Sequence, residues 1–495
     1  MLTRLKINGF KNLVNLDLRF GPFTCIAGSN AVGKSNIFDA IEFLSLLSEK
    51  PFVEAASLIR NQKDSTSNKT SSIRSIFHRI GNSFSKKISI EVEMIIPKSG
   101  QDELGQPAKA TYNFLRYSLE LEYDDSDRIN NRGPIKITKE ELIPIIKSTS
   151  SKHLLFEHIP MWRNSVLQGK RGVEFISTKT NDESEILINL HQDGGSSGKP
   201  KSFLAENLPR TVLSTVSYAS ETPTVLLAKR EMQSWRQLQL EPSAIRLPDS
   251  LDKFSYSSKL GSDGSNLPAT VYRLMKEQDE SIYVQLANSL SELIPDVQSV
   301  SIDRDEKRQL LTLMVINKDG TPLPARSLSD GTLRFLALAV LDLDYSAGGL
   351  ICLEEPENGI YPDRIPAIIE LLRSIPVDTN EEDDADNPLR QVIINTHSPR
   401  VVYEIPDSSL VFVELKEIVV DGVKCKTPHV SALSNTWRTT KGNMRPIAKG
   451  KLLSYFDINA TRTMDWFING KQKQETKIKN REDLMTLQGT LFANE

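Results

Sequence analysis

The first 200 residues show alternating apolar and polar positions that are typical of β-strands. Neighbouring side chains in a strand point to opposite faces, so this period of two predicts strands with one buried face. The alternating segments are residues 2–8, 14–26, 87–96, 112–123, 172–178 and 185–192. We expect the later segments to form an antiparallel sheet, with a turn in the Gly/Ser-rich residues 194–198. Residues 35–50 instead carry apolar positions at helical spacing.

The pattern changes after residue 200. Residues 202–295 are expected to be mostly helical, and buried strands then alternate with helices. The expected strands are 311–320, 349–355 and 390–398, and the expected helices between them are 333–343 and 362–375. Strands that alternate with helices predict a largely parallel sheet covered by helices. Residues 414–433 ("ELKEIVVDGVKCKTPHVSAL") are expected to form a hairpin.

Together these patterns predict an α/β fold with a mixed central sheet, an antiparallel β subdomain and a helical subdomain. No sustained heptad repeat is present, so we expect no long coiled coil. The expected divisions are an N-terminal lobe (1–200), a helical insertion (201–296), a C-terminal lobe (297–433) and a basic tail (434–495). The tail is a candidate docking segment for a partner.

Composition and charge narrow the class of protein. The 495 residues include 61 Lys and Arg against 64 Asp and Glu, so the net charge of −3 excludes a globally basic nucleic-acid binder. Residues 58–87 nevertheless form a local basic stretch, with seven basic residues and one acid, Asp64. These basic residues are Arg60, Lys63, Lys69, Arg74, Arg79, Lys86 and Lys87. The patch is a candidate DNA contact, and a solvated loop explains it equally well.

Neither a membrane nor a disulfide framework is expected. No apolar run approaches the roughly 20 residues that span a bilayer, and the N-terminus lacks the apolar core of a secretory signal. The three cysteines show no metal-ligand spacing. We therefore expect a cytoplasmic protein that makes no membrane contact.

Residues 28–35, "GSNAVGKS", match the phosphate-loop pattern G-x-x-x-x-G-K-[ST]. The match follows an expected strand and precedes an expected helix, which is the context that this loop requires. Gly28 and Gly33 let successive N–H groups face phosphate oxygens at a helix N-terminus. We expect Lys34 to neutralise the β- and γ-phosphates of ATP, and Ser35 to offer its hydroxyl to Mg²⁺.

Chemically active side chains also follow two of the buried strands. In "LICLEEPE" (350–357), Glu354 is expected to hold the Mg²⁺ shell, and Glu355 to orient or deprotonate water. In "VIINTHSP" (392–399), His397 could donate a hydrogen bond to the γ-phosphate. A solvated acidic turn would explain the glutamates alone, but the phosphate loop in the same chain favours the catalytic interpretation.

The stretch "SLSDGT" (327–332) precedes an expected helix. Ser329 is a plausible N-cap of that helix, and Gly331 would allow close approach of a backbone. The serine hydroxyl and the first N–H groups of the helix would form a second anion site. A capping motif alone explains the serine and leaves the glycine unexplained.

In this order, "GSNAVGKSN", "SLSDG", "ICLEEPENGIYP" and "NTHSP" resemble the motifs of ATP-binding-cassette (ABC) ATPases of the RecF, OLD-nuclease and structural-maintenance-of-chromosomes (SMC) group. The resemblance covers residues 1 to about 415. It implies that Asn30, Asn36 and the pair Lys11–Asn12 lie near the nucleotide. It also implies that Ser329 and Gly331 contact the γ-phosphate bound by a partner subunit, in a head-to-head homodimer or a larger homo-oligomer.

The chain departs from that group at two positions. Glu354 stands where aspartate is usual, and Gln62 is only a weak candidate for the Q-loop glutamine. These departures leave the lid over the nucleotide, and its response to Mg²⁺, undefined.

Three functions are compatible with the resemblance. The compact head resembles the PtuA ATPase subunit of Septu antiphage systems, which implies an ATPase that gates a partner nuclease, commonly of HNH type. A RecF-like DNA-repair ATPase without a nuclease is the main alternative. A self-contained OLD-type nuclease is less favoured, because residues 414–433 read as a hairpin that lacks the D-x-D pair of a toprim site.

Overall fold

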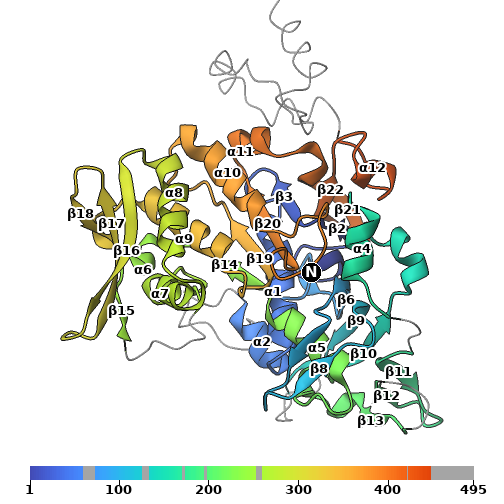
Figure 1. Ribbon diagram of the computed structural model, residues 1–495. Helices are drawn as coiled ribbons and strands as arrows, with labels where there is room; N and C mark the ends of the chain where they lie inside the picture. The colour runs from blue at the N-terminus through green and yellow to red at the C-terminus, as the bar shows by residue number, and fades with distance from the viewer. Residues whose placement is uncertain are drawn as a thin grey trace, which may run out of the picture. The chain divides into compact units, whose positions relative to one another are not determined.

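The computed structural model describes residues 1–59, 73–124, 133–169, 173–193, 198–251, 259–420 and 422–447. These residues form two compact units, which Figure 1 shows as ribbons. The first contains Met1–Arg236, Asp378–Asp383 and the described residues from Ser408 onward, and the second contains Gln237–Val377 and Asp384–Asp407. Both units combine helices and strands, so the predicted α/β class is confirmed.

An antiparallel sheet of eight strands dominates the first unit, in the order β13-β12-β11-β10-β9-β6-β1-β2. Its strands are β1 (Leu2–Asn8), β2 (Leu16–Arg19), β6 (Lys87–Ile95), β9 (Phe114–Tyr123), β10 (Ile135–Pro144), β11 (Ile176–Thr180), β12 (Ile186–Leu190) and β13 (Lys201–Leu204). The predicted antiparallel sheet is therefore present. It contains one long strand, β10, that the sequence pattern did not predict.

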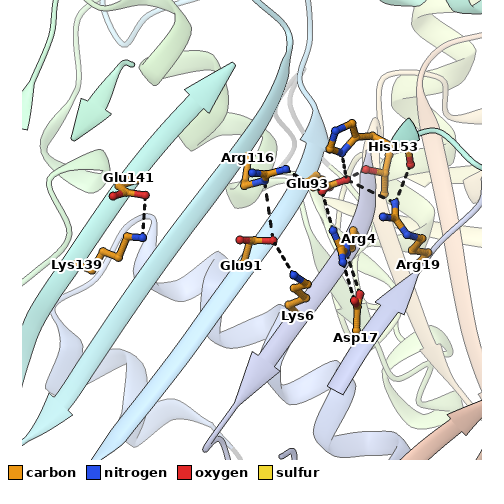
Figure 2. A network of polar contacts seen from close by, with 11 residues as sticks. Arg4, Lys6, Asp17, Arg19, Glu91, Glu93, Arg116, Lys139, Glu141 and His153 are labelled. Carbon is orange, nitrogen blue, oxygen red and sulfur yellow. Dashed lines mark hydrogen bonds and ion pairs between the residues drawn. The ribbon is translucent and has the colours of Figure 1, made fainter. Parts of the chain in front are cut away.

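The two faces of this sheet differ as the alternation requires. On β6, Ile88, Ile90 and Val92 are fully or almost fully buried, whereas Glu91 lies on the other face. That second face carries cross-strand pairs of opposite charge (Figure 2). Arg4 of β1 lies opposite Glu93 of β6, which in turn lies opposite Arg116 of β9. Such pairs stabilise a sheet and help to fix its register.

Glu93 is the centre of this charged network (Figure 2). Its side chain is fully buried and contacts His153 Nδ1 at 2.9 Å, Arg4 Nη1 at 3.1 Å and Arg116 Nη2 at 3.5 Å. Burial alone would raise the pKa of Glu93, but the hydrogen bond from His153 and the charges of His153, Arg19 and Arg4 lower it to about 2. The carboxylate is therefore held in its charged form across the ordinary pH range.

The first unit also contains the strands that frame the phosphate loop. β3 (Phe23–Ala27) is buried throughout and pairs in parallel with β21 (Leu410–Val420), which pairs antiparallel with β22 (Val423–Ser431). The predicted C-terminal hairpin is thus confirmed, whereas the predicted strand 14–26 is divided into β2 and β3. The helices of this unit are α1 (Lys34–Leu47), α2 (Phe52–Leu58), α4 (Pro160–Val166), α5 (Pro223–Gln233) and α12 (Trp437–Thr440).

The second unit holds two parallel strands, β19 (Gly349–Glu354) and β20 (Arg390–Thr396), joined through α10 (Ile365–Ser374). Every residue of β20 is buried, as expected for a strand covered on both faces. A separate antiparallel sheet is built from β15 (Asp249–Ser250), β16 (Val297–Asp305), β17 (Leu310–Asn317) and β18 (Pro322–Pro324). The remaining helices include α6 (Pro242–Ile245), α7 (Leu267–Gln278), α8 (Ser281–Leu293), α9 (Asp330–Leu343) and α11 (Pro399–Glu404).

Long coiled-coil arms and membrane-spanning helices were both expected to be absent from this chain. Among the described residues, helices reach at most 14 residues, in α1 and α9, so that part of the chain contains no long coiled-coil arm. The same part holds no helix with the length and hydropathy needed to cross a bilayer.

Candidate functional site

The phosphate loop occupies residues 28–33, between β3 and α1 in the first unit. Gly33 adopts a left-handed conformation (φ 99°), and a Cβ there would lie 2.6 Å from Asn12 Nδ2 and 2.7 Å from Pro428 Cγ. A Cβ on Gly28 would lie 2.5 Å from the carbonyl oxygen of Val413. Both glycines are therefore required by close packing, because any side chain would displace the loop.

Lys34 closes this loop. Its ammonium donates hydrogen bonds to the carbonyl oxygens of Gly28 (2.8 Å) and Ser29 (2.9 Å). The side chain is buried, whereas Ser29 and Asn30 at the tip of the loop are exposed. Ser35, in the first turn of α1, is half-buried. The loop thus encircles its own cation, and a cation at a helix N-terminus is suited to binding phosphate.

A second loop lies against the start of α1. Asn36 donates a hydrogen bond to Asn12 Oδ1 (2.7 Å), and Lys11 forms an ion pair with Asp39 (2.8 Å). His78 Nδ1 lies 2.6 Å from the carbonyl oxygen of Lys11. The structure therefore places Lys11, Asn12 and Asn36 together beside the phosphate loop, and their proximity to the nucleotide stays a prediction.

Two acidic side chains mark the end of β19 in the second unit. Glu354 is the last residue of that strand and lies in register with Asn395 of β20. Glu355 follows in a left-handed conformation (φ 45°), which is unusual for a residue with a side chain. Its N–H donates to the carbonyl oxygen of Asn395 (3.0 Å), which fixes the turn against β20.

The Glu355 carboxylate is held at both oxygens. Oε1 lies 2.7 Å from His397 Nδ1, and Oε2 accepts a hydrogen bond from Asn358 Nδ2 at 2.8 Å. Glu355 and His397 follow adjacent parallel strands, so both side chains emerge at the carboxyl edge of the β19–β20 pair. Glu355 remains 29% exposed and His397 42% exposed, so water can reach the pair. An oriented carboxylate of this kind can position or deprotonate a water molecule.

Ser329 acts as the N-cap of α9, since its hydroxyl accepts the N–H of Thr332 at 3.2 Å. A Cβ on Gly331 would lie 3.0 Å from the carbonyl oxygen of Gly359, in the turn that follows Glu355. Packing within the second unit therefore accounts for the glycine that capping alone left unexplained. The role of both residues in binding a partner's nucleotide stays a prediction.

Three residues of this region escaped the sequence interpretation: Glu357, Asn358 and Thr396. Glu357 is the third acid of the "EEPE" run, and its carboxylate accepts a hydrogen bond from Thr396 Oγ1. Asn358 contacts the Glu355 carboxylate, and its carbonyl oxygen accepts a hydrogen bond from Arg334 of α9. The sequence features that could have indicated these residues were a third acid after β19, Glu357, and a threonine directly before His397, Thr396.

The donors expected for Mg²⁺ are oxygen atoms. The carboxylate of Glu354, in the second unit, and the hydroxyl of Ser35, in the first, are each oxygen donors of the kind that Mg²⁺ prefers. The described residues include no cluster of three or more His, Cys, Asp or Glu side chains that could hold a metal by themselves.

The basic patch at residues 58–87 is only partly described. The guanidinium of Arg74 lies over the rings of Phe84 (5.3 Å) and Tyr123 (5.1 Å), and Lys87 forms an ion pair with Glu120. Residues of this patch that are described and exposed include Arg79, Lys86 and Lys87. Arg60, Lys63 and Lys69 lie outside the described residues, as do Gln62 and the basic tail from residue 448 onward.

Comparison with known families assigns the class of this chain. The family described as "AAA domain, putative AbiEii toxin, Type IV TA system" matches residues 23–402. The chain therefore belongs to this family of AAA-type ATPases. A search of the curated proteins found no match.

Solved structures with similarity to this chain include three Smc heads. An SmcHead bound to the C-winged helix domain of ScpA is 12% identical, with 88% of this chain and 98% of that chain covered and a TM-score of 0.42. An Smc head domain with an extended coiled coil, bound to the C-terminal domain of ScpA and derived from Pyrococcus furiosus, is 12% identical, with coverages of 89% and 99% and a TM-score of 0.41. An SMC head domain from Thermotoga maritima is 13% identical, with coverages of 86% and 98% and a TM-score of 0.36. At TM-scores below 0.5 these likenesses decide nothing further about this chain.

Proposed function

We propose that this chain binds ATP with Mg²⁺ through Gly28–Ser35 and hydrolyses it slowly, with Glu355 as the carboxylate that activates water. The observation that carries this proposal is the Glu355 carboxylate itself. It follows a buried strand, it is held at both oxygens by His397 and Asn358, and it remains accessible to water. Membership in an AAA-type ATPase family supports the same reaction.

Each side chain has a defined task in this reaction. The N–H groups of the loop and Lys34 bind the phosphates, and Ser35 and Glu354 would hold Mg²⁺, which when bound offsets phosphate charge. Glu355 accepts a proton from the attacking water or orients it. His397 holds Glu355 Oε1 in the present geometry, and it could donate to the γ-phosphate when ATP is bound.

The reaction is tested by turnover in the presence of Mg²⁺. We expect the wild-type chain to release phosphate from ATP, and Lys34→Ala to lose most of its nucleotide affinity, because the loop then lacks its cation. Equilibrium binding of a fluorescent ATP analogue measures the second effect. Wild-type protein without phosphate release, or K34A with unchanged affinity, would contradict the assignment.

We further propose that two such chains associate head to head around nucleotide, and that the ATPase gates a partner nuclease in antiphage defence. The toxin named in the family's description favours an effector system over DNA repair. A RecF-like repair ATPase without a nuclease remains the second candidate, on the strength of the motifs. Residues 414–433 lack a D-x-D pair and lie in the β21–β22 region, which does not support a self-contained OLD-type nuclease.

The identity of the partner can be tested with the adjacent gene. We expect it to encode an HNH-type nuclease or another effector that copurifies with this chain. Co-expression should protect cells from phage, and Glu355→Gln should remove that protection. Copurification with no nuclease, together with repair defects in cells that lack the gene, would support the RecF-like alternative.

A further inference from the structure

We propose that Glu357 and Thr396 form a buried clamp that positions the Glu355–His397 pair for hydrolysis. This role rests on the function proposed above and adds two positioning residues to it. The clamp joins the turn after β19, which carries Glu355, to the turn after β20, which carries His397. Neither clamp residue is expected to touch nucleotide.

The contacts of the clamp form a short chain. Thr396 Oγ1 donates to Glu357 Oε1, and the same hydroxyl oxygen accepts the N–H of Ser398 at 2.9 Å. The threonine hydroxyl therefore connects the carboxylate to the backbone on the far side of His397. Since His397 lies between Thr396 and Ser398, both neighbours of the imidazole are fixed by one side chain.

Burial makes these contacts strong. Thr396 is fully buried and Glu357 is 8% exposed. Burial raises the pKa of Glu357, and the hydrogen bond from Thr396 opposes that rise. A buried carboxylate that lost its donor would be left poorly satisfied, so the contact is costly to break.

The geometry of the pair explains why such a clamp is needed. Glu355 adopts a left-handed conformation that its own chemistry does not favour, and such backbones persist only where surrounding contacts over-determine them. The N–H of Glu355 is held by Asn395, one residue before Thr396. Consecutive residues of β20 therefore fix the two ends of the Glu355–Glu357 turn, and a small displacement of a reacting group can cost up to about a hundredfold in rate.

The clamp is tested with substitutions that preserve shape. Thr396→Val removes the hydroxyl and keeps the volume, whereas Thr396→Ser keeps the hydroxyl. We expect T396V to lower kcat for ATP by about ten- to a hundredfold with KM little changed, and T396S to retain kcat near the wild-type value. The melting temperature of T396V should fall, because the buried Glu357 carboxylate loses its donor. Thr270→Val is the matched control, because Thr270 is equally buried in the same unit and its hydroxyl donates to the carbonyl oxygen of Asn266.

A double variant separates positioning from a general structural role. If Thr396 acts through the pair, T396V combined with His397→Ala should lose little more kcat than H397A alone. The proposal would be overturned if the kcat of the double variant fell by the full product of the two single losses. It would also be overturned if T396V and T270V lost kcat equally, or if T396V kept the wild-type kcat. If the proposed ATPase function is wrong, the wild-type protein itself will release no phosphate from ATP. That result would overturn the clamp as well, and it is distinguishable from a loss of kcat that is confined to T396V.

Discussion

Glu355 and Glu357 lie two residues apart and have opposite surroundings. Glu355 is partly exposed and pairs with an imidazole, whereas Glu357 is buried and accepts a hydroxyl. Burial raises the pKa of Glu357. We therefore assign the accessible Glu355 carboxylate to the reaction with water, and the buried Glu357 carboxylate to the positioning of the turn.

Asn358 gives a prediction at this scale. Its amide holds Oε2 of Glu355, and Arg334 holds its carbonyl oxygen. Replacing Asn358 by alanine should lower turnover about tenfold and leave nucleotide affinity unchanged, because the carboxylate loses a donor that orients it. Steady-state phosphate release checks this, with Asn288→Ala on the exposed surface of α8 as the control. Wild-type turnover in N358A would show that His397 alone orients Glu355.

Single residues were predictable where a motif names them and not where a contact defines them. The motifs named Glu355 and His397 separately, as a carboxylate that acts on water and an imidazole that could face the γ-phosphate. Their contact at 2.7 Å is a finding of the structure. No local pattern in the sequence connects Thr396 with Glu357, which is 39 residues away. Ser329 was predicted both as a cap and as an anion site, and the structure bears on the first role only.

Secondary-structure elements were predictable where alternation is clean. The strand β10 was not predicted, because Glu140 occupies a fully buried position and a register shift interrupts the alternation between Ile137 and Lys139. Burial raises the pKa of Glu140 to about 7, against hydrogen bonds from the N–H groups of Leu213 and Val212. Because these hydrogen-bond donors of Glu140 are backbone N–H groups far away in the sequence, the sequence pattern alone places this glutamate on the surface.

The charged face of the eight-stranded sheet predicts a pH dependence of stability. The pKa of Glu93 falls from 4.5 to about 2 on folding, which corresponds to about 3 kcal/mol. Because the folded pKa is lowered, this stabilisation is present above pH 4.5 and is lost as the pH falls toward 2. Glu93→Gln should therefore lower the free energy of unfolding near neutral pH, and its acid dependence should be flatter.

Urea unfolding of both proteins from neutral pH to about pH 3 measures this difference. Glu120→Gln is the matched control, since Glu120 lies on the adjacent strand β9 and pairs with the exposed Lys87. A surface pair of this kind contributes little. Parallel pH profiles for E93Q and the wild type would mean that the network around Glu93 does not stabilise its charged form.

At the scale of the whole molecule, the proposed head-to-head dimer makes each nucleotide site depend on two chains. Lys34→Ala damages the phosphate loop, and Ser329→Arg damages the loop before α9 at an exposed position. Gly331 is the poorer choice for this test, because its substitution would disturb packing against Gly359. If Ser329 serves the partner's nucleotide, a mixed dimer of the two variants keeps one intact site.

We therefore expect each variant alone to be nearly inactive, and the co-expressed variants to recover part of the wild-type ATPase activity. Nucleotide-dependent association should be measured beside turnover, because coupling between sites could mask the recovery. Mixed variants that neither recover activity nor associate with nucleotide would exclude a site shared between chains.

The hydrolysis itself is tested most directly by Glu355→Gln. The substitution keeps the size of the side chain and its contacts on one oxygen, and removes the group that accepts a proton. Turnover of ATP should fall by about 10²- to 10⁴-fold, while the affinity for nucleotide stays near that of the wild type. Unchanged turnover in E355Q would remove Glu355 from the reaction and contradict the account of this site.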